Sequence, residues 1–239
     1  MELKILHLYP DLLNLYGDKG NIECMRKRLE WRGIDVSVQT YTSDSSGLDL
    51  SDVDIVFLGG GSDREQKIVC SRLLAYKGKI KEYVENDGVF VAVCGGYQLM
   101  GREYRMENET VEGLGILNIS TVLGNKRLIG DCVIKSELID DEIVGFENHG
   151  GRTYTGDYEP LGTVQSGYGN NGEDKKEGVV YKNTIATYIH GPLLPKNPAL
   201  ADHIITSALS KKYDENITLE PIDDSIENMA HEYCVERFK

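Results

Sequence analysis

One cysteine stands where the chain could place a nucleophile. The apolar run Val91-Ala92-Val93 is followed directly by Cys94-Gly95-Gly96-Tyr97-Gln98. A nucleophile on a sharp turn between a buried strand and a helix projects its reactive atom above the sheet, and small neighbours relieve the crowding there. Free N–H groups at the start of a helix favour a thiolate and can hold a developing oxyanion. We therefore predict that Cys94 is an exposed, ionised nucleophile and that the Gly95 amide is the first oxyanion donor.

A glycine loop supplies a candidate for the second donor. Gly59-Gly60-Gly61 follows an apolar run and precedes a predicted helix. Such a loop lets backbone amides approach a ligand closely. The phosphate-binding patterns Gly-x-x-x-x-Gly-Lys-Ser/Thr and Gly-x-Gly-x-x-Gly are absent. Beside a cysteine elbow we predict that the Gly60 amide holds the oxyanion, and a plain tight turn is the alternative.

A cysteine nucleophile needs a base, and five histidines are available. His190 ends the predicted strand at residues 184–189, and sites in open parallel sheets gather at the carboxyl ends of the strands. His149 lies in a polar, glycine-flanked segment at residues 146–151, which we predict to be a loop that could also face the cleft. The positions leave both open and favour His190. The remaining histidines fall in a predicted strand or in predicted helices and suit structural roles: His7, His203 and His231.

The elements that must position these residues follow from hydrophobic spacing. Apolar runs predict strands at residues 3–8, 34–41, 53–58 and 88–93. Helices are predicted at residues 18–32, at 63–85 with an interruption at Gly78, and from Cys94 to about residue 101. The run at 88–93 is apolar on both faces, which is typical of a central parallel strand. We predict a three-layer α/β fold with a mostly parallel, flavodoxin-like sheet and helices on both faces.

The second half of the chain has a different sequence pattern. Short β-like runs separated by glycines predict hairpins at residues 116–122, 128–136, 143–147, 163–164, 178–181 and 184–188. Helical spacing returns at residues 199–209 and 222–238. The polar stretch at residues 167–178 is predicted to be a mobile surface loop. No linker divides the chain, so residues 1–239 are expected to form one domain.

Composition excludes several classes of function. The net charge of −13 over 239 residues repels phosphate backbones and anionic headgroups, which argues against nucleic-acid binding and direct membrane insertion. No apolar run approaches the ~18–20 residues of a membrane helix, and the first residues do not resemble a signal peptide, so a cytoplasmic location is expected. The five cysteines include no Cys-x-x-Cys pair, so neither a zinc site nor a redox pair is predicted.

Three sequence blocks resemble those of the class I glutamine amidotransferases. They are the loop Gly59–Gly61, the elbow at residues 93–98, and Tyr188-Ile189-His190-Gly191-Pro192-Leu193-Leu194. The last block is similar to that of the branch typified by cobyric acid synthase and cobyrinate diamide synthase. The resemblance implies that Cys94 and His190 form the catalytic pair. Ordinary class I members carry a glutamate two residues after the histidine, whereas this chain carries Pro192, so the third triad member stays open between another residue and a dyad.

Over essentially its whole length the chain also resembles the glutaminase subunits of lipid II isoglutaminyl synthases. The segments that carry this likeness are residues 6–21 and residues 145–153. The resemblance implies hydrolysis of L-glutamine to glutamate and ammonia. It also implies a heterodimer with a Mur-ligase-like (MurT-like) synthetase subunit, which receives the ammonia and amidates the D-glutamate α-carboxyl of lipid II. ATP and Mg are expected on that partner, with no metal or organic cofactor in this subunit.

The resemblance also implies substrate contacts. Arg127 matches an arginine that binds glutamine, and its planar fork suits the α-carboxylate, although a solvated hairpin tip is the alternative. Gln98 matches the elbow glutamine, which contacts the substrate or braces the turn, and His149 is a further substrate-binding candidate. Three other functions stay open: a glutaminase for a cobyrinate-type synthetase, a stand-alone γ-glutamyl hydrolase, and a non-catalytic binding module.

Overall fold

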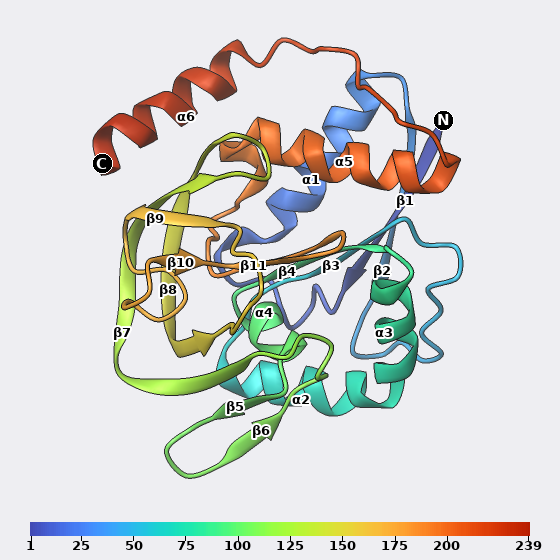
Figure 1. Ribbon diagram of the computed structural model, residues 1–239. Helices are drawn as coiled ribbons and strands as arrows, with labels where there is room; N and C mark the ends of the chain where they lie inside the picture. Colours follow the sequence, from blue (N-terminus) through green and yellow to red (C-terminus); the bar gives the residue numbers. More distant parts are fainter.

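The computed structural model describes all residues, 1–239, and contains two sheets. The first sheet has the strand order β11-β12-β4-β3-β1-β2 (Figure 1). Its strands are β1 (Glu2–Leu8), β2 (Asp35–Tyr41), β3 (Ile55–Leu58), β4 (Val89–Val93), β11 (Val179–Tyr181) and β12 (Thr184–Thr187). All are parallel except β11, which pairs antiparallel with β12. Every residue of β3, β4 and β12 is buried, as expected for central strands covered on both faces.

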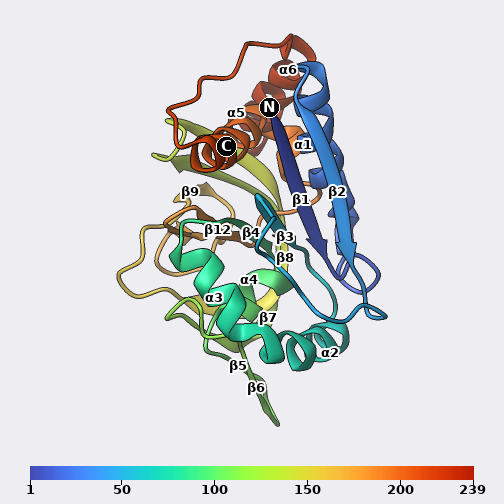
Figure 2. The same ribbon diagram turned by 90° about the vertical axis from the view of Figure 1, so that its right-hand side faces the viewer.

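Helices cover both faces of this sheet. On one face lie α1 (Lys19–Trp31) and α5 (Pro198–Tyr213), and on the other lie α2 (Asp63–Leu73), α3 (Lys77–Glu85) and α4 (Gly95–Met100) (Figures 1 and 2). In Figure 2 the edge formed by β1 and β2 faces the viewer. The predicted three-layer α/β fold is therefore confirmed.

The predicted helix at residues 63–85 is wrong in one respect. A 3-10 turn, η2 (Leu74–Tyr76), separates α2 from α3, so the break falls before Gly78 rather than at it. Tyr76 leaves helical geometry at φ −113° and ψ 8°. The Tyr76 hydroxyl accepts a hydrogen bond from the Gly47 N–H at 3.0 Å and lies 3.2 Å from the Tyr41 hydroxyl. Tyr76 therefore connects the end of β2 and the segment after it to the helical layer.

The second sheet is built around two long strands. Its order is β10-β9-β7-β5-β6, with β8 also paired to β7. The bounds are β5 (Glu103–Arg105), β6 (Thr110–Glu112), β7 (Ser120–Ser136), β8 (Asp141–Tyr154), β9 (Gly162–Ser166) and β10 (Lys176–Glu177). The runs predicted at residues 116–122 and 128–136 thus belong largely to one strand, which is irregular between Leu123 and Leu128. The predicted loop around His149 is wrong, because β8 continues through it and pairs His149 with Leu128.

The prediction of a mobile surface loop at residues 167–178 is wrong in part, because residues 167, 168 and 172–175 are exposed but the others are anchored. Asn170, Asn171 and Glu177 are buried in it. The Asn170 amide accepts hydrogen bonds from the Tyr97 hydroxyl at 3.0 Å and from the Gly178 N–H at 2.9 Å. A segment whose buried polar groups are satisfied in this way is fixed to the body of the protein.

The two sheets meet beside the end of β12. His190 and Phe146 exchange both backbone hydrogen bonds, at 2.9 and 3.1 Å, which joins β8 to the first sheet. Residues of both sheets contribute to one cluster of 52 buried apolar residues.

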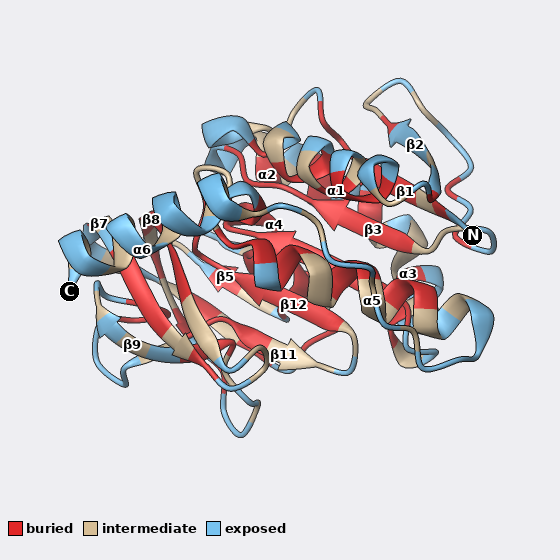
Figure 3. Cartoon of the chain, turned by 90° about the horizontal axis from the view of Figure 1, so that it is seen from above, coloured by how far each residue is buried: buried red, intermediate tan, exposed pale blue.

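The last helix, α6 (Ser225–Phe238), contains no buried residue and runs along β7 and β8 (Figure 3). Two short 3-10 turns complete the chain, η1 (Leu15–Gly17) and η3 (Leu194–Lys196). None of the helices combines the length and the apolar character that crossing a bilayer requires.

Candidate active site

Cys94 occupies a strained turn between β4 and α4. Its φ of 52° and ψ of −104° lie in a region that non-glycine residues rarely adopt. The Cys94 N–H donates to the Thr187 carbonyl at 2.8 Å, and the Gly96 N–H donates to the Gly59 carbonyl at 3.0 Å. A Cβ on Gly96 would lie 2.4 Å from the Leu58 carbonyl oxygen, so only glycine allows this close approach. The strand-to-helix elbow expected from the sequence is therefore present.

Enclosure changes the charge expected for the thiol. Cys94 is only 8% exposed. Burial raises the pKa of its thiol to about 12, and the negative charge of Asp18 raises it further, while a hydrogen bond from the Gly95 amide and the charge of Arg127 oppose this. The prediction of an exposed, ionised thiolate is wrong for this structure, because desolvation outweighs the start of a six-residue helix.

The thiol nevertheless faces open space. Cys94, Gln98, Arg127 and His149, four of the residues predicted from the sequence, line one cavity of about 220 Å³. Sequence reasoning missed other lining residues that are polar: Asp63, Gln66, Tyr104 and Asn148. The start of α2 directly after the glycine loop could have indicated Asp63 and Gln66. Tyr104 reaches the cavity from β5, and no local pattern marked it.

Arg127 has fixed and free donors. Its Nε donates to the Asn148 side-chain oxygen and its Nη2 to the Asn148 carbonyl, both at 2.8 Å. The remaining nitrogen, Nη1, lies near Gly150, where an added Cβ would come within 3.7 Å of it. Arg127 is therefore exposed but oriented against β8, and it retains a donor for a ligand in the cavity.

Gln98 and His149 are both tied to Tyr188. The Gln98 Nε2 donates to the Tyr188 hydroxyl at 3.1 Å, while its Oε1 is buried without a partner. The His149 ring stacks on Tyr188 at 3.6 Å, and its Nδ1 lies 2.8 Å from the Gly151 carbonyl oxygen. Gln98 thus braces the elbow and offers an unsatisfied acceptor, whereas His149 is held in place by its neighbours.

His190 follows β12, the neighbour of β4, but it is neither bonded to the elbow nor among the residues that line the cavity. β12 runs beside β4 with Thr187 opposite Val93, three residues before His190. Both ring nitrogens of His190 are buried without a hydrogen-bond partner, so the ring makes no hydrogen bond to Cys94. The ring stacks on Tyr16 at 4.2 Å. Burial lowers the pKa of His190 to about 4, and nearby positive charges add to this, so the imidazole is neutral.

No residue of this chain acts as the third member of a triad in this structure. No carboxylate is hydrogen-bonded to His190. Pro192, at the position where ordinary class I members carry a glutamate, packs against α1, since a Cβ on Gly20 would lie 2.6 Å from its Cγ.

The Gly60 amide does not face the cavity as predicted. It donates to the Asp18 Oδ2 at 2.8 Å, and Asp18 is completely buried. Burial raises the pKa of the Asp18 carboxyl to about 7, and its Oδ1 has no partner. A buried carboxylate requires donors, which explains why the amide turns toward it. Gly61, rather than Gly60, lines the cavity, while Gly60 lies so near the elbow that a Cβ would be 2.9 Å from that of Cys94.

No group of three or more His, Cys, Asp and Glu residues is arranged to hold a metal ion. The site therefore offers a thiol, an imidazole, backbone amides and a guanidinium, which together suit attack on a carbonyl carbon.

Solved structures share this fold. PurLQS from Thermotoga maritima has a TM-score of 0.57 at 16% identity, covering 90% of this chain and 100% of that chain. A glutamine amidotransferase from the same organism has a TM-score of 0.55 at 13% identity, covering 99% and 97%.

Sequence comparisons are more specific. The lipid II isoglutaminyl synthase (glutamine-hydrolyzing) subunit GatD of Staphylococcus aureus (strain N315) is 45% identical over 239 residues, which are 99% of this chain and 96% of that protein. The subunit of the same name from Streptococcus pneumoniae (strain ATCC BAA-255 / R6) is 44% identical over 97% of this chain and 90% of that protein. The sequence profile of the CobB/CobQ-like glutamine amidotransferase domain matches residues 4–198. This chain belongs to the CobB/CobQ-like glutamine amidotransferase family.

Proposed function

We propose that this chain is the glutamine-hydrolysing subunit of a lipid II isoglutaminyl synthase. One observation carries the proposal: the 45% identity to the Staphylococcus aureus subunit extends over 96% of that protein. By contrast, the match to the probable cobyric acid synthase of Methanococcus vannielii is 31% identical and covers 33% of that protein. The hypothesis of a cobyrinate-type glutaminase is therefore less well supported.

The reaction is hydrolysis of the side-chain amide of L-glutamine. The Cys94 sulfur attacks the amide carbon while its proton passes to His190, and the Gly95 amide and an amide of the glycine loop bind the oxyanion. The imidazolium protonates the departing nitrogen, ammonia leaves, and a thioester remains. His190 then takes a proton from water, and the resulting attack releases glutamate and restores the thiol.

Both partners of this proton transfer are neutral before the reaction. The thiol pKa lies near 12 and the imidazole pKa near 4, so no thiolate–imidazolium pair exists in advance. The transfer requires the imidazole within hydrogen-bonding distance of the sulfur, and the ring has two unpartnered nitrogens with which to make that bond. Within this chain the pair acts as a dyad.

The released ammonia serves a partner. We propose a heterodimer with a Mur-ligase-like (MurT-like) synthetase, which binds ATP and Mg and amidates the D-glutamate α-carboxyl of lipid II, while this subunit needs no metal or organic cofactor. Ammonia that reached bulk water would be protonated, so a closed passage between the subunits is required. The five free cysteines suit a reducing compartment, which supports a cytoplasmic location.

Two experiments test the proposal. The complex purified from its native cell should contain a synthetase of the Mur-ligase type, and recovery of a cobyrinate synthetase instead would support the alternative. That complex should release ammonia from L-glutamine, and the variants Cys94→Ala and His190→Ala should lose this activity while keeping the partner bound. Retained hydrolysis by Cys94→Ala would exclude Cys94 as the nucleophile. Release of glutamate from γ-glutamyl peptides by the chain alone would instead indicate a stand-alone hydrolase.

A further inference from the structure

The cavity beside Cys94 carries opposite charges on its walls. Among its lining residues the only guanidinium is that of Arg127 and the only carboxylate is that of Asp63. Arg127 is oriented by Asn148, as described above. Asp63 begins α2 immediately after the glycine loop and Ser62.

The Asp63 carboxylate is not used by the fold. The helix is capped by Ser62 and Glu65, which form a reciprocal capping box, with the Ser62 N–H donating to the Glu65 Oε2 at 2.9 Å. Asp63 itself makes neither a side-chain hydrogen bond nor an ion pair in this structure. Asp63 is exposed, and it lies in the first turn of α2, a position that suits an acidic side chain. A carboxylate in the wall of a cavity with no partner inside the protein is available to a ligand.

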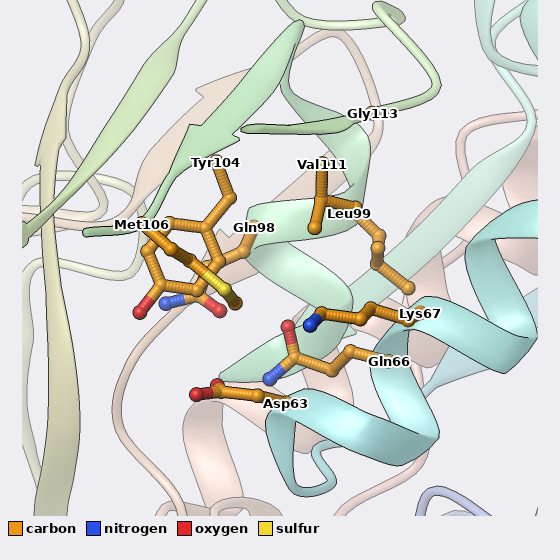
Figure 4. Close-up of a pocket in the computed structure, with 9 residues that line it drawn as sticks. All are labelled: Asp63, Gln66, Lys67, Gln98, Leu99, Tyr104, Met106, Val111 and Gly113. Carbon is orange, nitrogen blue, oxygen red and sulfur yellow. The ribbon is translucent and has the colours of Figure 1, made fainter. Parts of the chain in front are cut away.

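Asp63, Cys94, Tyr104 and Arg127 all line the same cavity. Burial raises the pKa of Tyr104 to about 12, and the charge of Asp63 raises it further while that of Arg127 lowers it. Figure 4 shows a neighbouring pocket, which does not include Cys94 or Arg127, and in it the polar ends of Asp63 and Gln66 of α2 lie toward Gln98 of α4 and Tyr104 of β5. The Asp63 carboxylate, the Arg127 guanidinium and the Cys94 thiol therefore belong to one cavity.

We propose that Asp63 binds the α-ammonium group of the substrate glutamine, opposite Arg127, which binds the α-carboxylate. This inference rests on the function proposed above. A free α-amino acid carries a cation and an anion on one carbon, with the side-chain amide two methylene groups away. Two opposite charges beside the thiol recognise that pattern and place the amide carbon at the sulfur.

This arrangement determines specificity. Glutaramate, which is glutamine without its α-amino group, leaves Asp63 facing no cation. A glutamine residue inside a peptide has neither charge at its α-carbon. The cavity should therefore select free L-glutamine over both, because a site built around a charged group rejects the analogue that lacks it.

Binding measurements test the role of Asp63. Calorimetry would use the full chain with Cys94→Ala to stop turnover, and would compare L-glutamine with glutaramate. Adding Asp63→Asn should weaken L-glutamine binding by about 10- to 100-fold, as expected for loss of a charged hydrogen bond. It should leave glutaramate binding unchanged, and Asp63→Glu should restore part of the affinity for L-glutamine. The control variant Asp35→Asn also removes one carboxylate, but Asp35 is exposed at the amino end of β2, away from the cavity. This variant should change the affinity for neither ligand.

Several outcomes would overturn the inference. An unchanged L-glutamine affinity in Asp63→Asn would show that the carboxylate does not bind the ammonium group. An equal loss for both ligands would show that Asp63 shapes the cavity without recognising charge. In either case glutamine hydrolysis by the native complex would leave the proposed function intact. If the chain that retains Asp63 binds no L-glutamine and the native complex hydrolyses none, both proposals fail.

Discussion

Cys94 should react slowly with alkylating reagents in the isolated chain. Only the thiolate attacks iodoacetamide, and burial holds the pKa of this thiol near 12. The perturbation is a pH series of alkylation rates, followed by mass spectrometry of the peptide that contains Cys94. Cys234, half-exposed on α6, reports that the reagent is active.

The expected rate can be worked out from the pKa. At pH 7.5 the thiolate fraction is about 3 × 10⁻⁵ for a pKa of about 12, against roughly 3% for the ordinary value of 9.0, a ratio of about 1,000. A more basic thiolate is also a better nucleophile, and a Brønsted slope of about 0.4–0.5 recovers roughly 16- to 32-fold. Cys94 should therefore react about 30- to 60-fold more slowly than an ordinary thiol, before any steric shielding, and its rate should rise about tenfold per pH unit from pH 6 to 9.

A variant separates this expectation from a preformed ion pair. Because neither ring nitrogen of His190 is bonded to the sulfur, His190→Ala should leave the alkylation rate of Cys94 unchanged. A thiolate stabilised by an imidazolium would instead give a rate that is flat across neutral pH and falls in His190→Ala. That result would refute the neutral resting state, whereas a steep pH dependence in both proteins would support it.

Three further predictions concern charged groups in and around the site. Burial raises the Asp18 pKa to about 7, above the ordinary value of 3.8. The contribution of this carboxyl to stability is therefore complete below pH 3.8 and is lost as the pH rises through about 7. The free energy of unfolding should be about 2.6 kcal/mol lower at pH 8 than at pH 5 because of this group. Urea titrations should show Asp18→Asn gaining stability over the parent by about that amount across this range, and parallel pH profiles would contradict it. Arg28→Met should lower the free energy of unfolding by about 3 kcal/mol, since it leaves the Asp224 carboxylate without its partner while Asp202 keeps its ion pair with Arg32. An unchanged urea midpoint would contradict this. Arg127→Met should raise KM for glutamine about 10- to 100-fold in the native complex, and a loss confined to kcat would argue against a role in binding the carboxylate.

The parallel core was predictable because its signals are local. Each of the runs at residues 55–58 and 89–93 is short, continuous and apolar, and each ends in glycine or in the cysteine elbow. A fully buried strand leaves that pattern wherever it occurs. The turn at Cys94 was predictable because two glycines directly follow the cysteine at the end of an apolar run. The structure gives the reason for the second glycine, since Gly96 approaches the Leu58 carbonyl too closely for any side chain.

The second sheet was harder to predict because its strands are defined by pairing. β7 continues through Gly124 and the polar residues after it, which locally favour a turn, and it is held by pairing with β8 on either side of the irregularity. Burial of the segment at residues 167–178 likewise depends on distant partners. Its composition is that of a mobile loop, yet Asn170 fills a position under Tyr97, seventy-three residues away along the chain. Propensity describes the chain before these contacts form and is overridden by them.

The charge of the active site shows the same limit most clearly. Sequence reasoning included the local effect, an amide at a helix start that lowers the thiol pKa, and the Gly95 hydrogen bond does act in that direction. It could not include desolvation, because the walls around Cys94 come from η1, β8 and the glycine loop, which only the tertiary fold assembles. The larger effect is the nonlocal one, and it acts on both members of the pair, raising the pKa of the thiol and lowering that of the imidazole. A cysteine and a histidine predicted from their positions can therefore both be uncharged at rest. In the proposed reaction the proton leaves the sulfur as the sulfur–carbon bond forms.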